Sequence, residues 1–147
     1  MERIKPARKK LTADNSNAII RQEVKKMYQV NFYRDRRGIE PVKEYLKELH
    51  DSKNPRDNKQ AAKINDYIEI LSAEGKAAGE PYIKHIQGEL WELRPARDRI
   101  FFVAYLEGTF VLLHVFTKKT PKTPRSEIEK ALREIADLKE RGLENEE

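Results

Sequence analysis

The sequence predicts a single domain of mixed α/β class, of the α+β type. The 147-residue chain has the length of one domain and contains no cysteine, so a hydrophobic core and not a disulfide framework must hold it together. Segments with strand-like patterns lie near the start and in the second half of the chain. Segments with apolar residues at helical spacing lie between them and at the end. The predicted order is one strand, two helices, an antiparallel meander of strands and a final helix.

Residues 28–33, Tyr-Gln-Val-Asn-Phe-Tyr, alternate apolar and polar side chains and predict a strand, which the charged turn 34–38 closes. A helix is expected to begin near Pro41, because proline suits a first helical position. A second helix over about 56–73, ending near Gly75, follows a short break and predicts an antiparallel pair. The apolar positions at helical spacing are Val42, Tyr45, Leu46 and Leu49, then Ala61, Ile64, Ile68 and Leu71.

Strands dominate the second half of the sequence. Residues 81–86 are expected to be extended, and 90–94, 100–107 and 109–117 are rich in aromatic and β-branched side chains. Glu107-Gly108 is a signal for a two-residue hairpin turn between the last two strands.

The final helix is predicted from its start signals and its apolar stripe. Thr123 is expected to cap it and Pro124 to occupy its first turn. Ile128, Ala131, Leu132, Ile135 and Leu138 form the stripe, which ends before Gly142.

Strand register predicts which side chains share a face. With Glu107-Gly108 as the turn, Leu106 faces Thr109, and further along Phe101 faces His114 and Arg99 faces Phe116. With a four-residue turn at 95–98, Arg94 faces Arg99 and Glu92 faces Phe101. One face is then expected to carry Glu92, Arg94, Arg99, Phe101, His114 and Phe116. The uncharged face, expected to pack on the helices, carries Leu93, Ile100, Phe102, Ala104, Leu106, Val111, Leu113 and Val115.

The net charge of +5 is unevenly distributed. Residues 1–27 carry 8 basic and 3 acidic side chains, and 94–122 carry 6 and 2, whereas the segments 28–93 and 123–147 are neutral to acidic. Two basic zones predict a polyanionic partner and exclude a uniformly basic coat. We expect a basic N-terminal extension over 1–27, either a solvated tail or an arm that contacts nucleic acid, then a domain over 28–142 and an acidic tail over 143–147.

The sequence also lacks several kinds of motif. It has no glycine loop for phosphates, no dinucleotide fingerprint, no paired histidines for zinc and no nucleophile elbow, so no metal or cofactor is expected. No apolar run is long enough for a membrane span, and a cytoplasmic location is expected.

The stretch Leu90-Trp91-Glu92-Leu93-Arg94, the spaced Arg99, the strand end over 110–119 and Lys122-Thr-Pro before a helix containing Glu127 resemble the phage-derived HigB-like group of the RelE/ParE toxin superfamily. The resemblance runs from about residue 28 to 138. It implies a RelE-like fold and the toxin of a type II toxin-antitoxin system, an mRNA endoribonuclease that commonly acts on the ribosome and arrests translation. It also implies a HigA-like helix-turn-helix antitoxin, through which alone operator DNA is bound.

The residue types favour RNA cleavage independently of the family resemblance. Metal-free RNA cleavage requires removal of the 2′-hydroxyl proton, stabilisation of a dianionic transition state and protonation of the leaving oxygen. Arg94 and Arg99 suit the second task, because a planar guanidinium holds two phosphate oxygens. His114 is the expected general acid or base, Glu92 its orienting partner or the base itself, and Lys118 a further proton-transfer group. Predicted RNA-binding residues are Arg97, Lys119, Lys122, Lys84, His85 and Phe116.

Simpler interpretations of these residues are also possible from the sequence. His114 lies in an apolar strand, where a histidine is usually a hydrogen-bonded core residue, and the two arginines can instead form salt bridges with Glu92 and Asp98. A ParE-like gyrase inhibitor and a non-catalytic nucleic-acid-binding module are the alternative functions. Fold alone does not separate them.

Overall fold

The structure is a computed structural model that describes residues 27–143. Its elements are β2 (Gln29–Phe32), α1 (Pro41–Asp51), α2 (Pro55–Glu74), the short 3-10 helix η2 (Gly75–Ala78), β3 (Ile83–Gln87), β4 (Leu90–Leu93), β5 (Asp98–Ala104), β6 (Thr109–Thr117) and α3 (Arg125–Arg141). The predicted α+β class and order of elements are confirmed. The predicted extension 1–27 and tail 143–147 lie outside the described residues, apart from one residue of each. None of the helices in the described part is long and apolar enough to cross a membrane.

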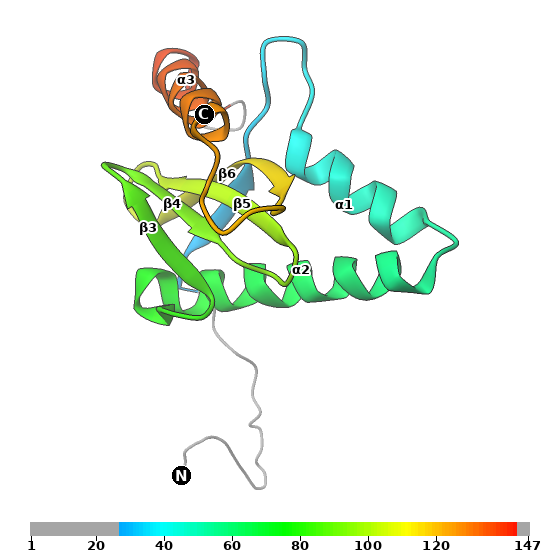
Figure 1. The fold of residues 1–147 in the computed structure, drawn as a ribbon. Helices are drawn as coiled ribbons and strands as arrows, with labels where there is room; N and C mark the ends of the chain where they lie inside the picture. Colours follow the sequence, from blue (N-terminus) through cyan, green and yellow to red (C-terminus); the bar gives the residue numbers. More distant parts are fainter. Residues whose placement is uncertain (1–26, 144–147) are drawn as a thin grey trace, which may run out of the picture.

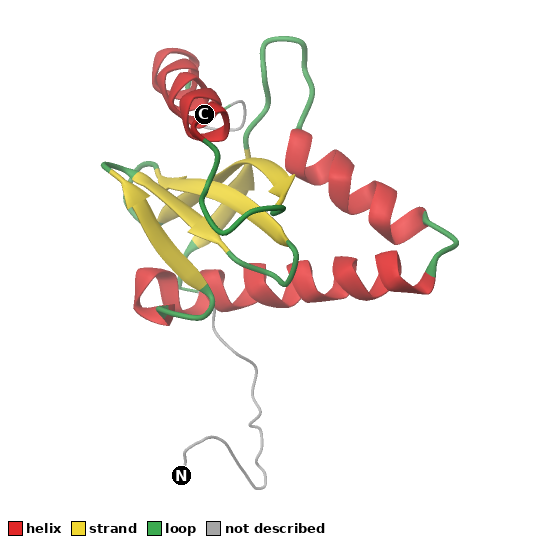
Figure 2. Ribbon diagram, in the orientation of Figure 1, coloured by secondary structure: helices red, strands yellow, loops and turns green. Residues whose placement is uncertain are grey.

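The five strands form one sheet in the order β2, β6, β5, β4, β3. β2 pairs with β6 in parallel, and the other pairs are antiparallel. Figures 1 and 2 show α3 above the sheet and α2 beneath it, with α1 forming a hairpin with α2. Leu93, Ile100 and Phe102 pack with the hairpin, whereas Phe101 and Val103 pack with α3. Both faces of the sheet are therefore covered, although we expected one of them to remain an open, partly charged surface.

Local signals explain most helix boundaries. Asn54 caps α2 by accepting a hydrogen bond from a backbone N–H of the first turn at 3.0 Å. Gly75 ends α2 at a φ of +60°, and a Cβ there would lie 2.7 Å from the ring of Tyr28, so a larger residue would force the two apart. The predicted cap of α3 at Thr123 is wrong. Pro124 itself occupies the cap position and no side chain bonds to the first turn.

The hairpin between β5 and β6 has a longer turn than expected. The Tyr105 N–H donates to the carbonyl of Thr109 at 2.9 Å, which closes a loop that includes Leu106 as well as Glu107-Gly108. Leu106 adopts a φ of 61° and is 60% exposed. The two-residue turn, and the burial of Leu106 that it implied, were wrong because Leu106 belongs to the turn and not to the strand.

A β-bulge lies in the middle of this hairpin. Ile100 is opposite Val115 but Phe102 is opposite Leu112, so the consecutive residues 113–114 of β6 face a single residue of β5. An extra residue in one strand shifts the pairing by one position and changes the face to which the following side chains point.

The predicted register is correct on one side of the bulge and wrong on the other. At the end of the hairpin away from the turn, Arg99 lies opposite Phe116 as predicted. Nearer the turn, Val111 and Leu113 pack with α3 and not with Leu93 as expected. The bulge therefore compensates for the misplaced turn in the part of the sheet that carries the arginines.

Candidate functional site

The strand ends bring one acidic and four basic side chains together. The predicted register of β4 and β5 is confirmed, with Glu92 opposite Phe101. Lys84 of β3 lies opposite Glu92 on its other side. We call Glu92, Arg94, Arg99, Lys84 and Lys118 the Glu92 cluster, because all four cations interact electrostatically with this carboxylate. Four positive charges around one negative charge leave the cluster with a net excess of three.

Glu92 joins the two arginines. It is 2% exposed, and its Oε2 atom lies 3.4 Å from the Nε of Arg94 and 3.8 Å from the Nε of Arg99. The alternative interpretation, in which the arginines form salt bridges with Glu92, is therefore partly correct, although this carboxylate is buried and does not lie at the surface. Among the described residues, the Glu92 Oε1 atom and both Nε atoms have no hydrogen-bond partner. The pairing is thus incomplete, and polar atoms in the cluster are left without the hydrogen bonds that buried groups normally make.

Burial dominates the electrostatics of the cluster. It raises the pKa of Glu92, although Arg99, Arg94, Lys118 and Lys84 all act to lower it. Burial likewise lowers the pKa of the Arg99 guanidinium against the attraction of Glu92. Both directions mean that the charged forms lose more hydration than the ion pair returns. An additional anion bound between the arginines would offset this cost for the two guanidinium groups.

The turn between β4 and β5 holds Arg99 in place. Its Nη1 atom donates to the carbonyl of Ala96 at 2.8 Å and to that of Asp98 at 2.9 Å. Ala96 itself has a φ of 56°, which is strained for a residue with a side chain. The guanidinium is therefore fixed by backbone atoms before any ligand arrives.

Asp98 organises the base of the turn, and sequence reasoning missed this. It is fully buried and accepts hydrogen bonds from the Tyr45 hydroxyl at 2.8 Å, from Gln60 at 3.0 Å and from Thr117 at 3.0 Å. Its contact with Arg97 is longer, at 4.0 Å. We considered Asp98 only as a surface partner for the arginines. The available signal was an aspartate that opens an apolar strand directly opposite a threonine.

His114 does not share an open surface with the arginines. It is 2% exposed beneath α3, and its ring packs edge-on against Phe101 with centroids 5.5 Å apart. Its Nδ1 lies 2.6 Å from an oxygen of Glu134, and its Nε2 lies 2.9 Å from an oxygen of Glu127. Both ring nitrogens are occupied, so no substrate atom can reach them while α3 is in this position. Sequence reasoning missed the two glutamates, although their spacing of seven residues places them on one helix face.

The remaining predicted RNA-binding residues are distributed around the cluster. Phe116 is half-buried on the same face as Arg99, with its ring 5.2 Å from that of Phe101. Lys119 and Lys122 are exposed in the loop between β6 and α3.

Two further predicted residues contact other parts of the molecule. Arg97 is exposed and lies 3.4 Å from Asp57 of α2. His85 lies opposite Trp91 in the strand pair, and the two rings are tilted against each other with centroids 5.0 Å apart. Both side chains lie on the face opposite Glu92, so the structure does not bring His85 to the cluster.

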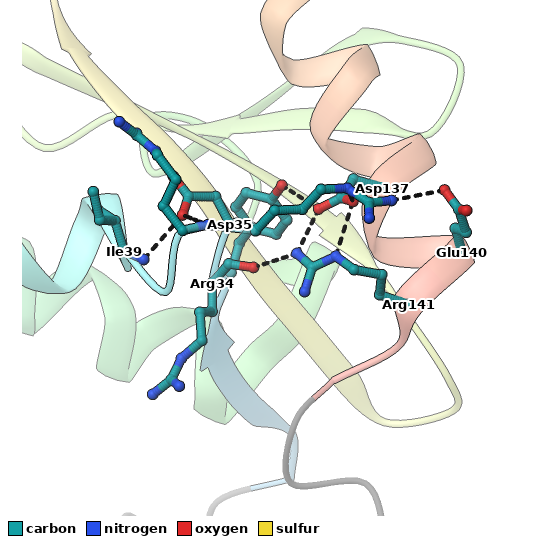
Figure 3. Close-up of polar contacts among 9 residues, drawn as sticks. Arg34, Asp35, Ile39, Asp137, Glu140 and Arg141 are labelled. Atoms are coloured by element: carbon teal, nitrogen blue, oxygen red, sulfur yellow. Dashed lines mark hydrogen bonds and ion pairs between the residues drawn. The ribbon is translucent and has the colours of Figure 1, made fainter.

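A second charged group is satisfied internally. Figure 3 shows Asp137 of α3 between the loop that follows β2 and Arg141. Asp137 accepts from Tyr33 at 2.6 Å and from Arg141 at 2.9 Å, and it pairs with Arg36 at 2.9 Å. The hydrogen bond from Arg141 is the main cause that holds the Asp137 pKa well below its usual range, and burial raises the pKa of Tyr33. These contacts hold α3 to the start of the domain.

A comparison with protein families identifies the family of the chain. The model of the family described as phage-derived protein Gp49-like (DUF891) matches residues 42–136, about two thirds of the chain. This span includes every member of the Glu92 cluster and all three helices in whole or in part. No curated protein matches the chain.

Proposed function

The chain belongs to the Gp49-like family of phage-derived proteins, a RelE-like family of toxin type, and from this membership we propose that it is the toxin of a type II toxin-antitoxin pair. Its proposed activity is metal-independent cleavage of messenger RNA, on the ribosome, in the manner of the HigB-like toxins that the sequence resembles. Translation then stops because the message is destroyed.

The observation that carries the proposal is the Glu92 cluster itself. Arg94 and Arg99 are held side by side at 3.4 Å and 3.8 Å from one buried carboxylate, with both Nε atoms lacking hydrogen-bond partners among the described residues. A phosphodiester supplies two oxygens to such a pair of guanidinium groups. An anion site with this excess of positive charge is suited to a transition state that gains negative charge.

We assign the steps as follows. The 2′-oxygen attacks the adjacent phosphorus and loses its proton to Glu92, whose pKa is raised by burial and which therefore has an increased affinity for a proton. Arg94 and Arg99 hold the two non-bridging oxygens. The bond from phosphorus to the 5′-oxygen breaks, and Lys118 gives that oxygen a proton. The products are a 2′,3′-cyclic phosphate and a free 5′-hydroxyl.

Other residues position the message. Arg97, Lys119 and Lys122 are exposed around the cluster and contact further phosphates in this proposal, and Phe116 stacks on a base. His114 acts through structure: it holds α3 on the sheet by its two carboxylate contacts. His85, on the opposite face, has no place in the proposed site.

The proposed partners are those expected for a HigB-like toxin. A HigA-like helix-turn-helix antitoxin binds the toxin and covers the basic surface, and operator DNA is bound only through that complex. The ribosome presents the message to the Glu92 cluster.

Cleavage of a ribosome-bound message tests the activity. Purified protein is added to ribosomes programmed with a defined message, and the new 3′ ends are analysed. Ends that carry a cyclic or 3′-phosphate, lost in the Arg94→Gln/Arg99→Gln double variant, support the proposal. Intact message at toxin excess overturns it.

The burial of His114 favours a second candidate. A purely binding function requires no titrating group, and both ring nitrogens of His114, the predicted general acid or base, face carboxylates of α3. The alternative is a ParE-like inhibitor of gyrase or another non-catalytic binder on the same fold. A gyrase supercoiling assay separates the two, since inhibition without any message cleavage identifies the binder.

A further inference from the structure

The charged residues of α2 are separated along the helix. Its first half carries three exposed cations, Arg56, Lys59 and Lys63, and one acidic residue, Asp57, which pairs with Arg97. Asp66 and Glu69 lie in the second half. A count over the whole segment 28–93 hides this separation because the charges nearly cancel. The positive half also contains the helix N-terminus, where the aligned peptide dipoles add a partial positive charge.

The positive half of α2 lies against the turn that carries the arginines. Gln60 donates to the carbonyl of Pro95 at 2.8 Å, and Arg97 lies 3.4 Å from Asp57. Figure 1 shows the connection between β4 and β5 resting on this part of the helix. Lys59 and Lys63 flank Gln60 in the sequence by one and three residues, so the helix presents them beside the same turn.

Aromatic residues continue the surface toward β3. The Lys63 ammonium lies 5.8 Å from the centre of the Tyr67 ring, which packs edge-on against Tyr82 at 5.1 Å. The Tyr82 carbonyl in turn accepts a hydrogen bond from the backbone N–H of Arg94 at 2.9 Å. A chain of contacts thus connects α2 to the Glu92 cluster.

The cations of α2 are free for a ligand, unlike those of α1. Within the described residues, Arg56, Lys59 and Lys63 form no ion pair with a carboxylate. On α1, Lys43 lies 3.7 Å from Glu40 and Lys47 lies 2.9 Å from Asp51. Unpaired cations in a row of about 10 Å along a helix fit a run of phosphates better than a single small anion.

We infer that Arg56, Lys59 and Lys63 form a phosphate-contacting surface that holds single-stranded RNA next to the cleaved bond, across the 95–98 turn from the Glu92 cluster. The inference rests on the proposed function for the identity of the ligand. It adds a surface on α2 that sets how much RNA the protein binds, separate from the residues that cut it.

Salt dependence of binding measures the number of phosphates contacted. Affinity for a fluorescent single-stranded RNA of about 20 nucleotides, 2′-O-methylated throughout so that it cannot be cleaved, is measured by anisotropy over a range of KCl concentrations. Each phosphate contact contributes about 0.7 to the slope of log affinity against log salt for single strands. The Lys59→Gln/Lys63→Gln variant is expected to lower that slope by about 1.4.

The matched control is Lys43→Gln/Lys47→Gln, which removes the same charge from the paired lysines of α1. It is expected to leave the slope unchanged, and thermal unfolding confirms that both variants are folded. An unchanged slope in the α2 variant, or an equal fall in both variants, overturns the inference.

The binding assay also separates this inference from the proposed function. Wild-type protein that binds RNA with the α2-dependent slope but leaves a ribosome-bound message intact retains the inference and overturns the nuclease. If the wild-type protein cleaves the message but the α2 variant binds RNA with the full slope, the nuclease proposal is retained and the α2 inference is overturned. Wild-type protein without measurable RNA affinity overturns the α2 surface.

Discussion

The Nδ1 atom of His114 lies 2.6 Å from a carboxylate oxygen of Glu134, in the buried interface between β6 and α3. The Nε2 atom also faces a carboxylate, that of Glu127, at 2.9 Å. The two contacts tie two positions of α3, seven residues or about two turns apart, to one residue of the sheet. His114 is therefore a structural link between the helix and the sheet.

Loss of the buried half of this link should destabilise the protein. Glu134→Gln replaces a buried charge-assisted hydrogen bond by a neutral one, at a cost of about 2 kcal/mol in the free energy of unfolding. Glu127→Gln should cost less, because the Glu127 side chain is 30% exposed and water replaces the contact. Urea unfolding measures both, with the exposed Glu129→Gln on the same helix as control. Equal midpoints for Glu134→Gln and wild type would contradict the structural link.

Glu92→Gln should strengthen anion binding. The variant removes the negative charge between Arg94 and Arg99 while keeping the size of the side chain, so the net excess of positive charge rises by one. A unit charge about 4 Å away is worth several kcal/mol at moderate dielectric. After screening we expect about tenfold tighter binding of RNA or of inorganic phosphate. Calorimetric titration measures it, and weaker binding would show that Glu92 positions the arginines more than it competes with the ligand.

The same variant should change how stability depends on pH. The pKa of Glu92 is raised in the folded state, so the folded protein binds this proton more readily than the unfolded chain. The stability that Glu92 contributes is therefore fully present below its unfolded pKa and is lost as pH rises through the folded pKa. Wild type should gain stability relative to Glu92→Gln as pH falls from 7 to 4. Urea unfolding of the pair at several pH values measures the difference.

Asp137→Asn should show the opposite pH dependence. The hydrogen bond from Arg141 is the main cause that lowers the Asp137 pKa in the folded state, so the stabilisation is present above the unfolded pKa and is lost as pH falls through the folded one. We expect the variant to be about 2 kcal/mol less stable at pH 7, with the difference shrinking below about pH 4. Unfolding at pH 7, 5 and 3 tests this, and a difference that stays constant would exclude ionisation of Asp137 as its cause.

Much of the fold could be predicted because it depends on local signals. The Pro41 and Asn54-Pro55 helix starts and the pairing of Leu93 with Ile100 all follow from turn chemistry and periodicity within a few residues. The bulge at 113–114 could not be predicted, because an alternating apolar strand looks the same in sequence with or without an extra residue. Nor could the parallel pairing of β2 with β6, which joins segments about 80 residues apart.

The part of the candidate site that depends on local signals could also be predicted. Arg94, Arg99 and Glu92 are neighbours across one tight turn, so their proximity follows from register. The surroundings of His114 depend on where α3 packs, and those of Asp98 on side chains from α1 and α2. Such tertiary contacts leave no periodic signal in the sequence.

Relief of backbone strain should stabilise the turn of the site. Ala96 has a φ of 56°, a conformation that costs a residue with a Cβ about 1 kcal/mol and costs glycine little. Ala96→Gly should therefore raise the free energy of unfolding by about 0.5 kcal/mol, after the greater freedom of glycine in the unfolded chain is subtracted. Ala104→Gly, in regular strand conformation and also exposed, should lower it. Thermal unfolding of the pair tests the sign, and a loss in both would show that Ala96 is not strained.

Arg99→Lys should separate positioning from charge in the proposed reaction. The variant keeps the positive charge, but an ammonium lacks the planar fork in which one nitrogen holds the carbonyls of Ala96 and Asp98 while the other nitrogens face a phosphate. We expect single-turnover cleavage of a ribosome-bound message to fall about 100-fold, the effect of losing one preorganised transition-state donor. Arg97→Lys, in an exposed side chain paired with Asp57, should lower the rate less than about tenfold. Equal rates for Arg99→Lys and wild type would mean that charge alone suffices and that the fixed guanidinium has no role in the chemistry.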